Sequence, residues 1–135
     1  MKLLRILILP AALLLFSSVI ISAVIKDQPT AHSDGSAIIV EWNTLDESGV
    51  VRFDVMRSTD VNGTFFAVGS REPTGNNSSY KYTDNQVFKA TGGFYVYKIR
   101  TYFGDRPPVD SETASVQHLS SAYRRTWGSI KAMFR

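Results

Sequence analysis

The sequence contains no cysteine and only two histidines among its 135 residues. The absence of cysteine excludes disulfide bonds, a lipid-modified cysteine anchor and any thiolate metal site, so the fold must rest on its hydrophobic core. The two histidines, His32 and His118, lie near the two ends of the predicted domain, and no Gly-x-Ser-x-Gly motif is present. We therefore expect both histidines to be neutral surface residues, and we predict no catalytic residue, no metal site and no cofactor.

Charged residues are also absent from Ile6–Ile25, a run of 20 residues that follows Lys2 and Arg5. A basic start, an apolar centre and a small residue at Ala23 are typical of a secretory signal peptide. The run is close to the roughly 20 residues that a membrane-spanning helix needs, so an uncleaved N-terminal anchor is the alternative. In both cases residues 1–23 direct the rest of the chain out of the cytoplasm, because the basic residues hold the N-terminus inside.

Acidic residues are missing from the C-terminal end of the chain. Residues 119–135 contain four basic residues and no acidic one, whereas residues 27–118 contain 12 acidic and 8 basic residues, a net charge of −4. The basic isoelectric point of about 9.3 therefore reflects the N-terminal segment and the tail rather than the domain. This distribution gives no reason to expect a nucleic-acid partner.

Helical periodicity is lacking between residues 24 and 118, where short alternating runs predict β-strands separated by turns. The expected strands are residues 37–42, 51–57, 65–68, 80–84, 94–102 and 113–118. Alternation along two of them places these side chains toward the core: Val51, Phe53, Val55, Tyr95, Tyr97 and Ile99. The pattern predicts an all-β, immunoglobulin-like sandwich of about seven antiparallel strands over residues 24–118.

Three of these segments, Val40–Trp42, Phe53–Ser58 and Tyr95–Ile99, resemble fibronectin type III domains of bacterial surface and secreted proteins. The resemblance covers nearly the whole domain and implies that Trp42 is the main core aromatic residue. It also implies that Tyr95 is the corner tyrosine, whose hydroxyl returns to upstream backbone. The missing cysteines argue against an antibody-type domain, which carries an inter-sheet disulfide. Domains of this kind serve as binders, spacers and structural units, so the resemblance leaves the function open.

The basic tail, residues 119–135, is predicted to contain a short amphipathic helix. At helical spacing, one apolar stripe consists of Tyr123, Trp127, Ile130 and Phe134. The basic side chains lie mostly off this stripe and include Arg124, Arg125 and Lys131. Because an isolated helix this short is marginal in water, we expect it to form against another surface. That surface is its own sandwich, a groove in a partner protein or an anionic membrane, and we favour docking to another molecule.

The sequence thus favours a non-catalytic, exported interaction module of the cell envelope or extracellular space, with the tail as its docking element. An alternative is a structural subunit, in which the tail of one copy docks on the next copy and builds a surface layer or filament. A weaker alternative is carbohydrate binding through aromatic residues expected at the surface, such as Tyr80, Tyr102 and Phe103.

Overall fold

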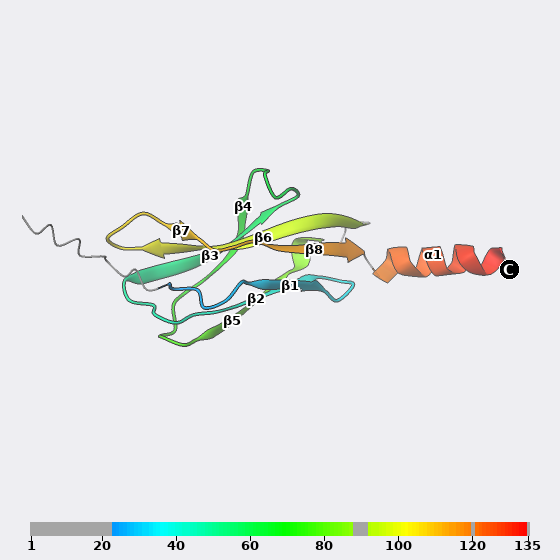
Figure 1. Cartoon of the computed structure of the whole chain (residues 1–135). Helices are drawn as coiled ribbons and strands as arrows, with labels where there is room; N and C mark the ends of the chain where they lie inside the picture. The colour runs from blue at the N-terminus through cyan, green and yellow to red at the C-terminus, as the bar shows by residue number, and fades with distance from the viewer. Residues whose placement is uncertain (1–22, 88–91, 120, 135) are drawn as a thin grey trace, which may run out of the picture.

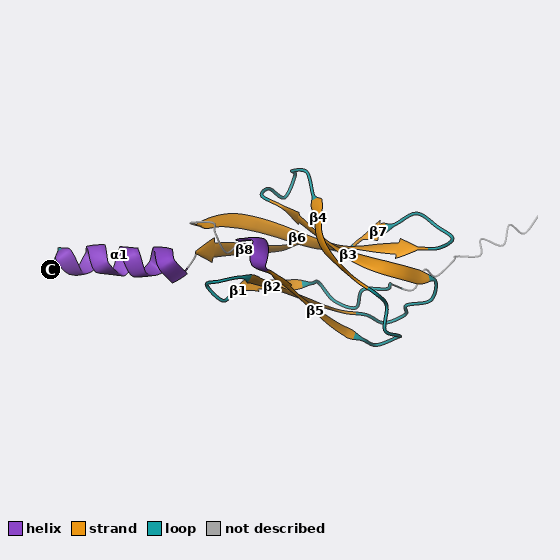
Figure 2. Ribbon diagram, turned by 180° about the vertical axis from the view of Figure 1, so that it is seen from behind, coloured by secondary structure: helices purple, strands orange, loops and turns teal. Residues whose placement is uncertain are grey.

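The computed structural model describes residues 23–87, 92–119 and 121–134, and its strands form two antiparallel sheets that pack face to face (Figure 1). The predicted N-terminal signal or anchor helix lies outside the described residues. One sheet has the order β1 (Thr30–Ser33), β2 (Ile38–Asn43) and β5 (Ser79–Asp84). The other has the order β4 (Phe66–Arg71), β3 (Val50–Ser58) and β6 (Gly92–Phe103), followed by β7 (Val109–Asp110) and β8 (Ala114–Leu119). A 3-10 turn, η1 (Asn85–Val87), and the helix α1 (Ser121–Met133) complete the described elements (Figure 2).

Both β7 and β8 pair with β6, at different points along its length. β7 pairs with Arg100 and Thr101, whereas β8 pairs with the residues from Gly92 to Tyr97. The two short strands therefore share one edge of the sheet, and the sandwich has seven strand positions. This confirms the predicted all-β sandwich with a short C-terminal helix.

Two strands were not expected from the sequence. β1 reads Thr-Ala-His-Ser, with no alternation of apolar and polar residues, and β7 has only two residues. β1 exists because β2 offers it four paired positions, from Thr30 opposite Glu41 to Ser33 opposite Ile38. Strands of this kind are defined by the neighbouring strand rather than by their own side chains.

The alternation expected along β3 is interrupted near its start. Val50 pairs with Phe103 and Arg52 pairs with Tyr102, so Val51 is an extra residue in a β-bulge. Val51 is consequently 53% exposed, and the expectation that it faces the core is wrong. Val50 is buried in its place, and Phe53 and Val55 are fully buried beyond the bulge.

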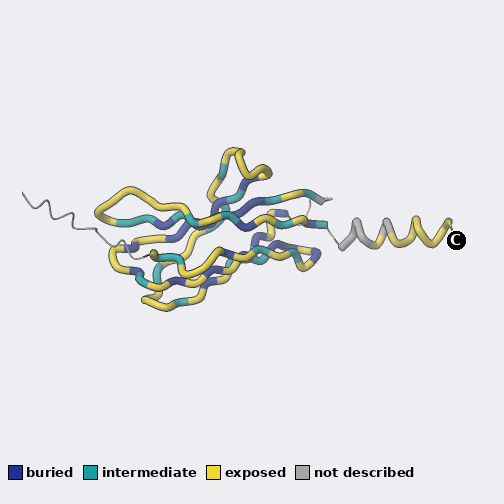
Figure 3. Tube along the Cα trace, viewed as in Figure 1, coloured by how far each residue is buried: buried dark blue, intermediate teal, exposed yellow. Residues whose placement is uncertain are grey.

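The core lies between the two sheets, where Figure 3 shows the buried segments facing one another. Trp42 of β2 stacks on Tyr80 of β5 with ring centroids 5.1 Å apart, and both rings contact Phe53 of the opposite sheet. Tyr97 and Ile99 of β6 are fully buried in the same cluster, and Tyr95 packs against it while partly exposed. Aromatic contacts therefore join the two sheets across the core of this cysteine-free domain.

The strand β4 lies at the edge of its sheet and is bulged at Val68. The Tyr82 hydroxyl of β5, in the other sheet, donates a hydrogen bond of 2.6 Å to the Val68 carbonyl oxygen. Gly69 lies beside the Tyr82 ring so closely that a Cβ atom at this position would overlap it. The glycine thus allows the tyrosine to cross from one sheet to the edge of the other.

Candidate functional site

The C-terminal helix α1 follows β8 directly in the chain and extends away from the sandwich (Figure 1). Its bounds match the predicted docking helix, and the whole predicted stripe from Tyr123 to Phe134 falls on it or at its end. The side chains of Tyr123, Arg124 and Trp127 lie outside the described residues. The stripe is therefore described by its C-terminal half.

The described apolar side chains of α1 are exposed. Ile130 is 39% exposed, Met133 81% and Phe134 85%. Met133 was not part of the predicted stripe, but it lies one turn from Ile130 and widens the apolar face. Arg125 and Lys131 are also exposed. The half of the stripe that the structure describes is thus presented to solvent rather than packed on the sandwich.

A pocket of about 380 Å³ lies between the N-terminal described segment and the β6–β7 hairpin. Figure 1 shows this hairpin at the end of the sandwich opposite to α1. The apolar lining of the pocket includes Val24, Ile25, Phe103 and Val109. Its acidic lining residues are Asp27, Asp110 and Glu112, and its basic ones are Lys26 and Arg106. Val109 is 57% exposed, so part of this apolar surface is in contact with solvent. Sequence reasoning missed the pocket because it joins the N-terminal segment to a hairpin some 80 residues away.

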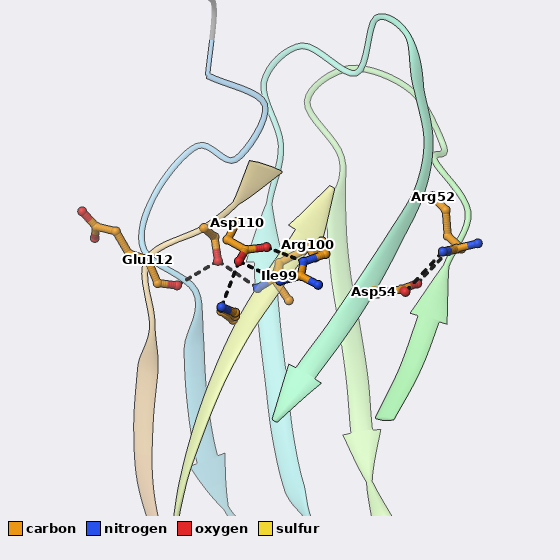
Figure 4. A network of polar contacts seen from close by, with 8 residues as sticks. Arg52, Asp54, Ile99, Arg100, Asp110 and Glu112 are labelled. Atoms are coloured by element: carbon orange, nitrogen blue, oxygen red, sulfur yellow. Dashed lines mark hydrogen bonds and ion pairs between the residues drawn. The ribbon is translucent and has the colours of Figure 1, made fainter. Parts of the chain in front are cut away.

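Charged side chains occupy one face of the larger sheet, around β3, β6 and β7 (Figure 4). The Asp110 carboxylate forms ion pairs with Arg100 at 2.7 Å and with Lys98 at 2.8 Å. Arg52 forms an ion pair with Asp54 at 2.7 Å. Arg100 and Asp54 are paired positions of adjacent strands. The opposite charges thus alternate across the strands and pair with one another, and Asp54 is only 7% exposed, which describes a structural ion-pair face rather than an open binding site.

Acid is expected to weaken the hairpin that carries Asp110. Hydrogen bonds from Arg100, and then those from Lys98, lower the pKa of this carboxyl from 3.8 to about 2. Because the folded pKa is depressed, the stabilisation is complete above pH 4 or so and is lost as pH falls toward 2. The side chains of Arg100 and Asp110 are about one-third exposed, so screening limits the effect to about 1 kcal/mol or less.

Denaturant unfolding of the parent and of Asp110→Asn at pH 5 and pH 2 measures this contribution. We expect the destabilisation caused by the substitution to be largest at pH 5 and to shrink toward pH 2. An equal difference at both pH values would mean that the ionised carboxylate contributes nothing.

A buried polar cluster joins the two sheets at Asp84, whose side chain is fully buried. The Arg57 guanidinium of β3 donates to its Oδ2 atom at 2.6 Å, and the Tyr97 hydroxyl of β6 donates at 2.8 Å. Burial, together with the bond to Asp84, raises the pKa of Tyr97 well above its usual value. The resemblance to fibronectin type III domains implied that Tyr95 is the corner tyrosine, whose hydroxyl returns to upstream backbone. In the structure, the hydroxyl that returns from β6 to an upstream residue is that of Tyr97, and its acceptor is the Asp84 side chain rather than backbone.

A second buried carboxylate, that of Glu47, ties two loops together. It accepts hydrogen bonds from the Tyr80 hydroxyl at 2.5 Å, from Thr44 Oγ1 at 2.7 Å and from the Gly75 backbone at 2.8 Å. Burial and the bond to Glu47 raise the pKa of Tyr80. Both carboxylate oxygens of Glu47 accept hydrogen bonds that fix the two loops. The cluster therefore presents no open group that could react with a substrate.

The aromatic residues considered for carbohydrate binding do not form an open platform. Tyr80 is only 7% exposed, which corrects the expectation that it lies at the surface. The Arg52 guanidinium lies 4.3 Å from the Tyr102 ring centroid, and the Arg106 guanidinium lies 3.8 Å from that of Phe103. Both partly exposed rings are thus covered by cations on one face.

The two histidines differ from each other. His32 on β1 is exposed, as expected, but His118 on β8 is fully buried. Its Nδ1 atom lies 2.7 Å from the Ser33 hydroxyl, and its Nε2 atom is buried without a hydrogen-bond partner among the described residues. The expectation of a surface His118 is wrong because β1 packs against β8 and covers it. Over the described ranges, no group of three metal-ligating side chains comes together.

Comparison with known proteins supports the fold. No protein family model and no curated protein matches the chain. It is similar to a fibronectin type III-like protein from Clostridium thermocellum, with 28% identity, a TM-score of 0.51, and 68% of this chain matched to 92% of that one. It is also similar to the pectate lyase Pel3 from Pectobacterium carotovorum, with 22% identity and a TM-score of 0.52. The chain therefore has a fibronectin type III-like β-sandwich fold.

The likeness to the lyase is confined to a part of that enzyme. It covers 65% of this chain but only 26% of the lyase, so most of the lyase chain has no counterpart here. A likeness at this identity shows the fold alone. In the ranges that the structure describes, no helix is both long and apolar enough to cross a membrane.

Proposed function

We propose that this chain is a non-catalytic, exported interaction module that docks to another protein through α1. The observation that carries the proposal is the exposure of Ile130, Met133 and Phe134 on a helix that extends beyond the sandwich. Apolar side chains gathered on one helix face usually mark a contact surface, because their exposure to water costs free energy that burial against a partner recovers. Helices of this kind bind in grooves through anchors spaced three, four and seven residues apart.

Three features support a role without catalysis. Of the two histidines, His118 is enclosed between strands and His32 lies exposed on the short strand β1. The buried carboxylates Asp84 and Glu47 already accept several hydrogen bonds each. The likeness to a lyase covers about a quarter of that enzyme, so its activity is not carried over to this chain.

Export is part of the same proposal. Its support is the sequence pattern of residues 1–23, with a basic start, an apolar centre and a small residue at the end. The absence of cysteine is compatible with either an oxidising or a reducing compartment. The proposed location is the cell envelope or the extracellular space.

Site-specific photo-crosslinking in the producing cells tests the proposal. A photoreactive residue at Phe134 is expected to crosslink to a protein, whereas one at Phe66 is not. Phe66 is a matched control because it is also an exposed phenylalanine, at 67%, but lies on β4. Affinity of the purified partner should then fall by roughly tenfold or more with Phe134→Asp and remain unchanged with Phe66→Asp. Crosslinks no stronger at Phe134 than at Phe66, or crosslinks to lipid alone, would overturn it.

A further inference from the structure

We infer that the partner of α1 is a second copy of this chain, which receives the helix in the pocket beside β7. The inference rests on the proposed function and adds to it the identity of the partner and the receiving site. It is supported by the positions of helix and pocket, by the chemistry of both surfaces and by the charge of the two parts of the chain.

The β6–β7 hairpin, which lines the pocket, lies at the end of the sandwich opposite to α1 (Figure 1). Each copy therefore presents one donor end and one receiving end. When α1 of one copy enters the pocket of the next, both the helix of the second copy and the pocket of the first remain available. Such a head-to-tail contact continues into an open chain unless its rotation closes a ring.

The chemistry of the two surfaces is complementary. The helix offers exposed apolar side chains at Ile130, Met133 and Phe134, and the pocket offers an apolar lining that includes Phe103 and Val109. A volume of about 380 Å³ lies at the lower end of the roughly 300–1,000 Å³ of pockets that enclose small molecules. The pocket therefore suits a few side chains at the end of a helix rather than a whole helix.

The charges of the two parts are opposite. Residues 27–118 carry a net charge of −4 and residues 119–135 a net charge of +4. The pocket lining itself is mixed in charge: Asp27 and Glu112 are exposed, and so are Lys26 and Arg106, so the attraction comes from the net charge of the whole domain. The basic helix is thus attracted to the sandwich of the next copy. An anionic membrane is less favourable, because docking there would bring the acidic sandwich close to a surface of the same charge.

The contact at each junction is small, since it involves one end of one short helix. Interfaces below about 1,200 Å² are usually weak and transient. Assembly should therefore appear only as concentration rises into the micromolar to millimolar range, roughly, and should weaken as salt screens the opposite charges.

Two variants separate the donor from the receiver. Phe134→Asp disables the helix and leaves the pocket intact, whereas Val109→Arg places a cation in the pocket and leaves the helix intact. Both positions are exposed, so the fold should tolerate the changes. Matched controls are Phe66→Asp and Val61→Arg, because Phe66 and Val61 are exposed to 67% and 50% but lie around β4, away from both surfaces.

Sedimentation velocity on the full chain as the host exports it, over a series of concentrations, tests the inference. The parent and both controls are expected to form species that grow with concentration, and each variant alone should stay monomeric. An equal mixture of Phe134→Asp and Val109→Arg should form a dimer that grows no further, since only one productive junction is left. Its dissociation constant should match that of a single parent junction.

Three results would overturn the inference. They are a monomeric parent at all concentrations, a Val109→Arg chain that assembles like the parent, and a mixture that remains monomeric when the parent assembles. Failure of the wider proposal is distinct from these, because a helix that crosslinks to a different protein leaves the interaction function standing. Binding of the parent to vesicles with anionic lipid, without self-assembly, would assign the helix to a membrane instead.

Discussion

Substitution of Asp84 by alanine is expected to destabilise the domain by about 3–5 kcal/mol, the usual effect of removing one partner of a buried ion pair. The Asp84 side chain is fully buried and that of Arg57 is only 23% exposed, so water cannot replace the lost carboxylate efficiently. The Tyr97 hydroxyl loses its acceptor in the same step. The substitution therefore leaves the Tyr97 hydroxyl without its acceptor and the largely buried Arg57 guanidinium without its counter-charge, with only a 3.4 Å hydrogen bond to the Gln86 side-chain oxygen remaining.

Equilibrium denaturation of Asp84→Ala, Arg57→Met and the double variant measures this effect and the coupling between the two side chains. We expect the double variant to be more stable than the sum of the single effects predicts, by about 1–3 kcal/mol. Arg52→Met is the matched control, because Arg52 also lies on β3 and pairs with an aspartate but is 48% exposed. It should change stability by less than Arg57→Met does, because the Arg52 side chain is itself half exposed, although its Asp54 partner is only 10% exposed. Strictly additive effects at Asp84 and Arg57 would contradict the assignment of a coupled pair.

The second large effect is expected at Phe53. Its side chain is fully buried and contacts both Trp42 and Tyr80 across the sandwich. Phe53→Ala should destabilise the domain by about 3–5 kcal/mol, through the lost burial and the cavity that remains between the sheets. No disulfide limits the unfolded chain, so this loss falls directly on a core that is already small.

Phe66→Ala provides the control for Phe53→Ala, since Phe66 is 67% exposed on the neighbouring strand β4. It should alter stability by no more than about 0.5 kcal/mol. Thermal and urea unfolding, followed by the near-ultraviolet aromatic signal to which the buried Trp42 contributes, reports both variants on one scale. Similar losses for the two phenylalanines would mean that the aromatic contacts across the sheets do not dominate the core.

The sequence was sufficient to predict the sandwich because its long strands carry their own pattern. β2, β3, β5 and β6 all appear close to their expected bounds, since alternation and turn residues act locally. The exposed Val51 was missed because a bulge shifts the alternation by one residue, and only the pairing with β6 reveals it. β1 escaped prediction because a neighbouring strand, not its own polar sequence, defines it.

The candidate surfaces and the buried polar residues divide in the same way. The stripe on α1 could be found from helical spacing alone, because helical periodicity is local. The pocket could not, since Val24 and Val109 become neighbours only after folding. His118 and Glu47 were also beyond reach, because their burial depends on segments distant in sequence: β1 covers the histidine, and the loop at Gly75 closes over the glutamate. Charged or titratable residues carry no local signal of being buried.

The Tyr82 hydroxyl that caps the Val68 carbonyl at the edge of β4 has a consequence for crowded conditions. An uncapped edge strand offers a template on which strands of neighbouring chains can add, and this route leads to aggregation. With one carbonyl occupied and the strand bulged at the same residue, β4 is a poor template for such addition. In a concentrated solution, neighbouring copies are thereby discouraged from merging their sheets, and each domain keeps its own fold.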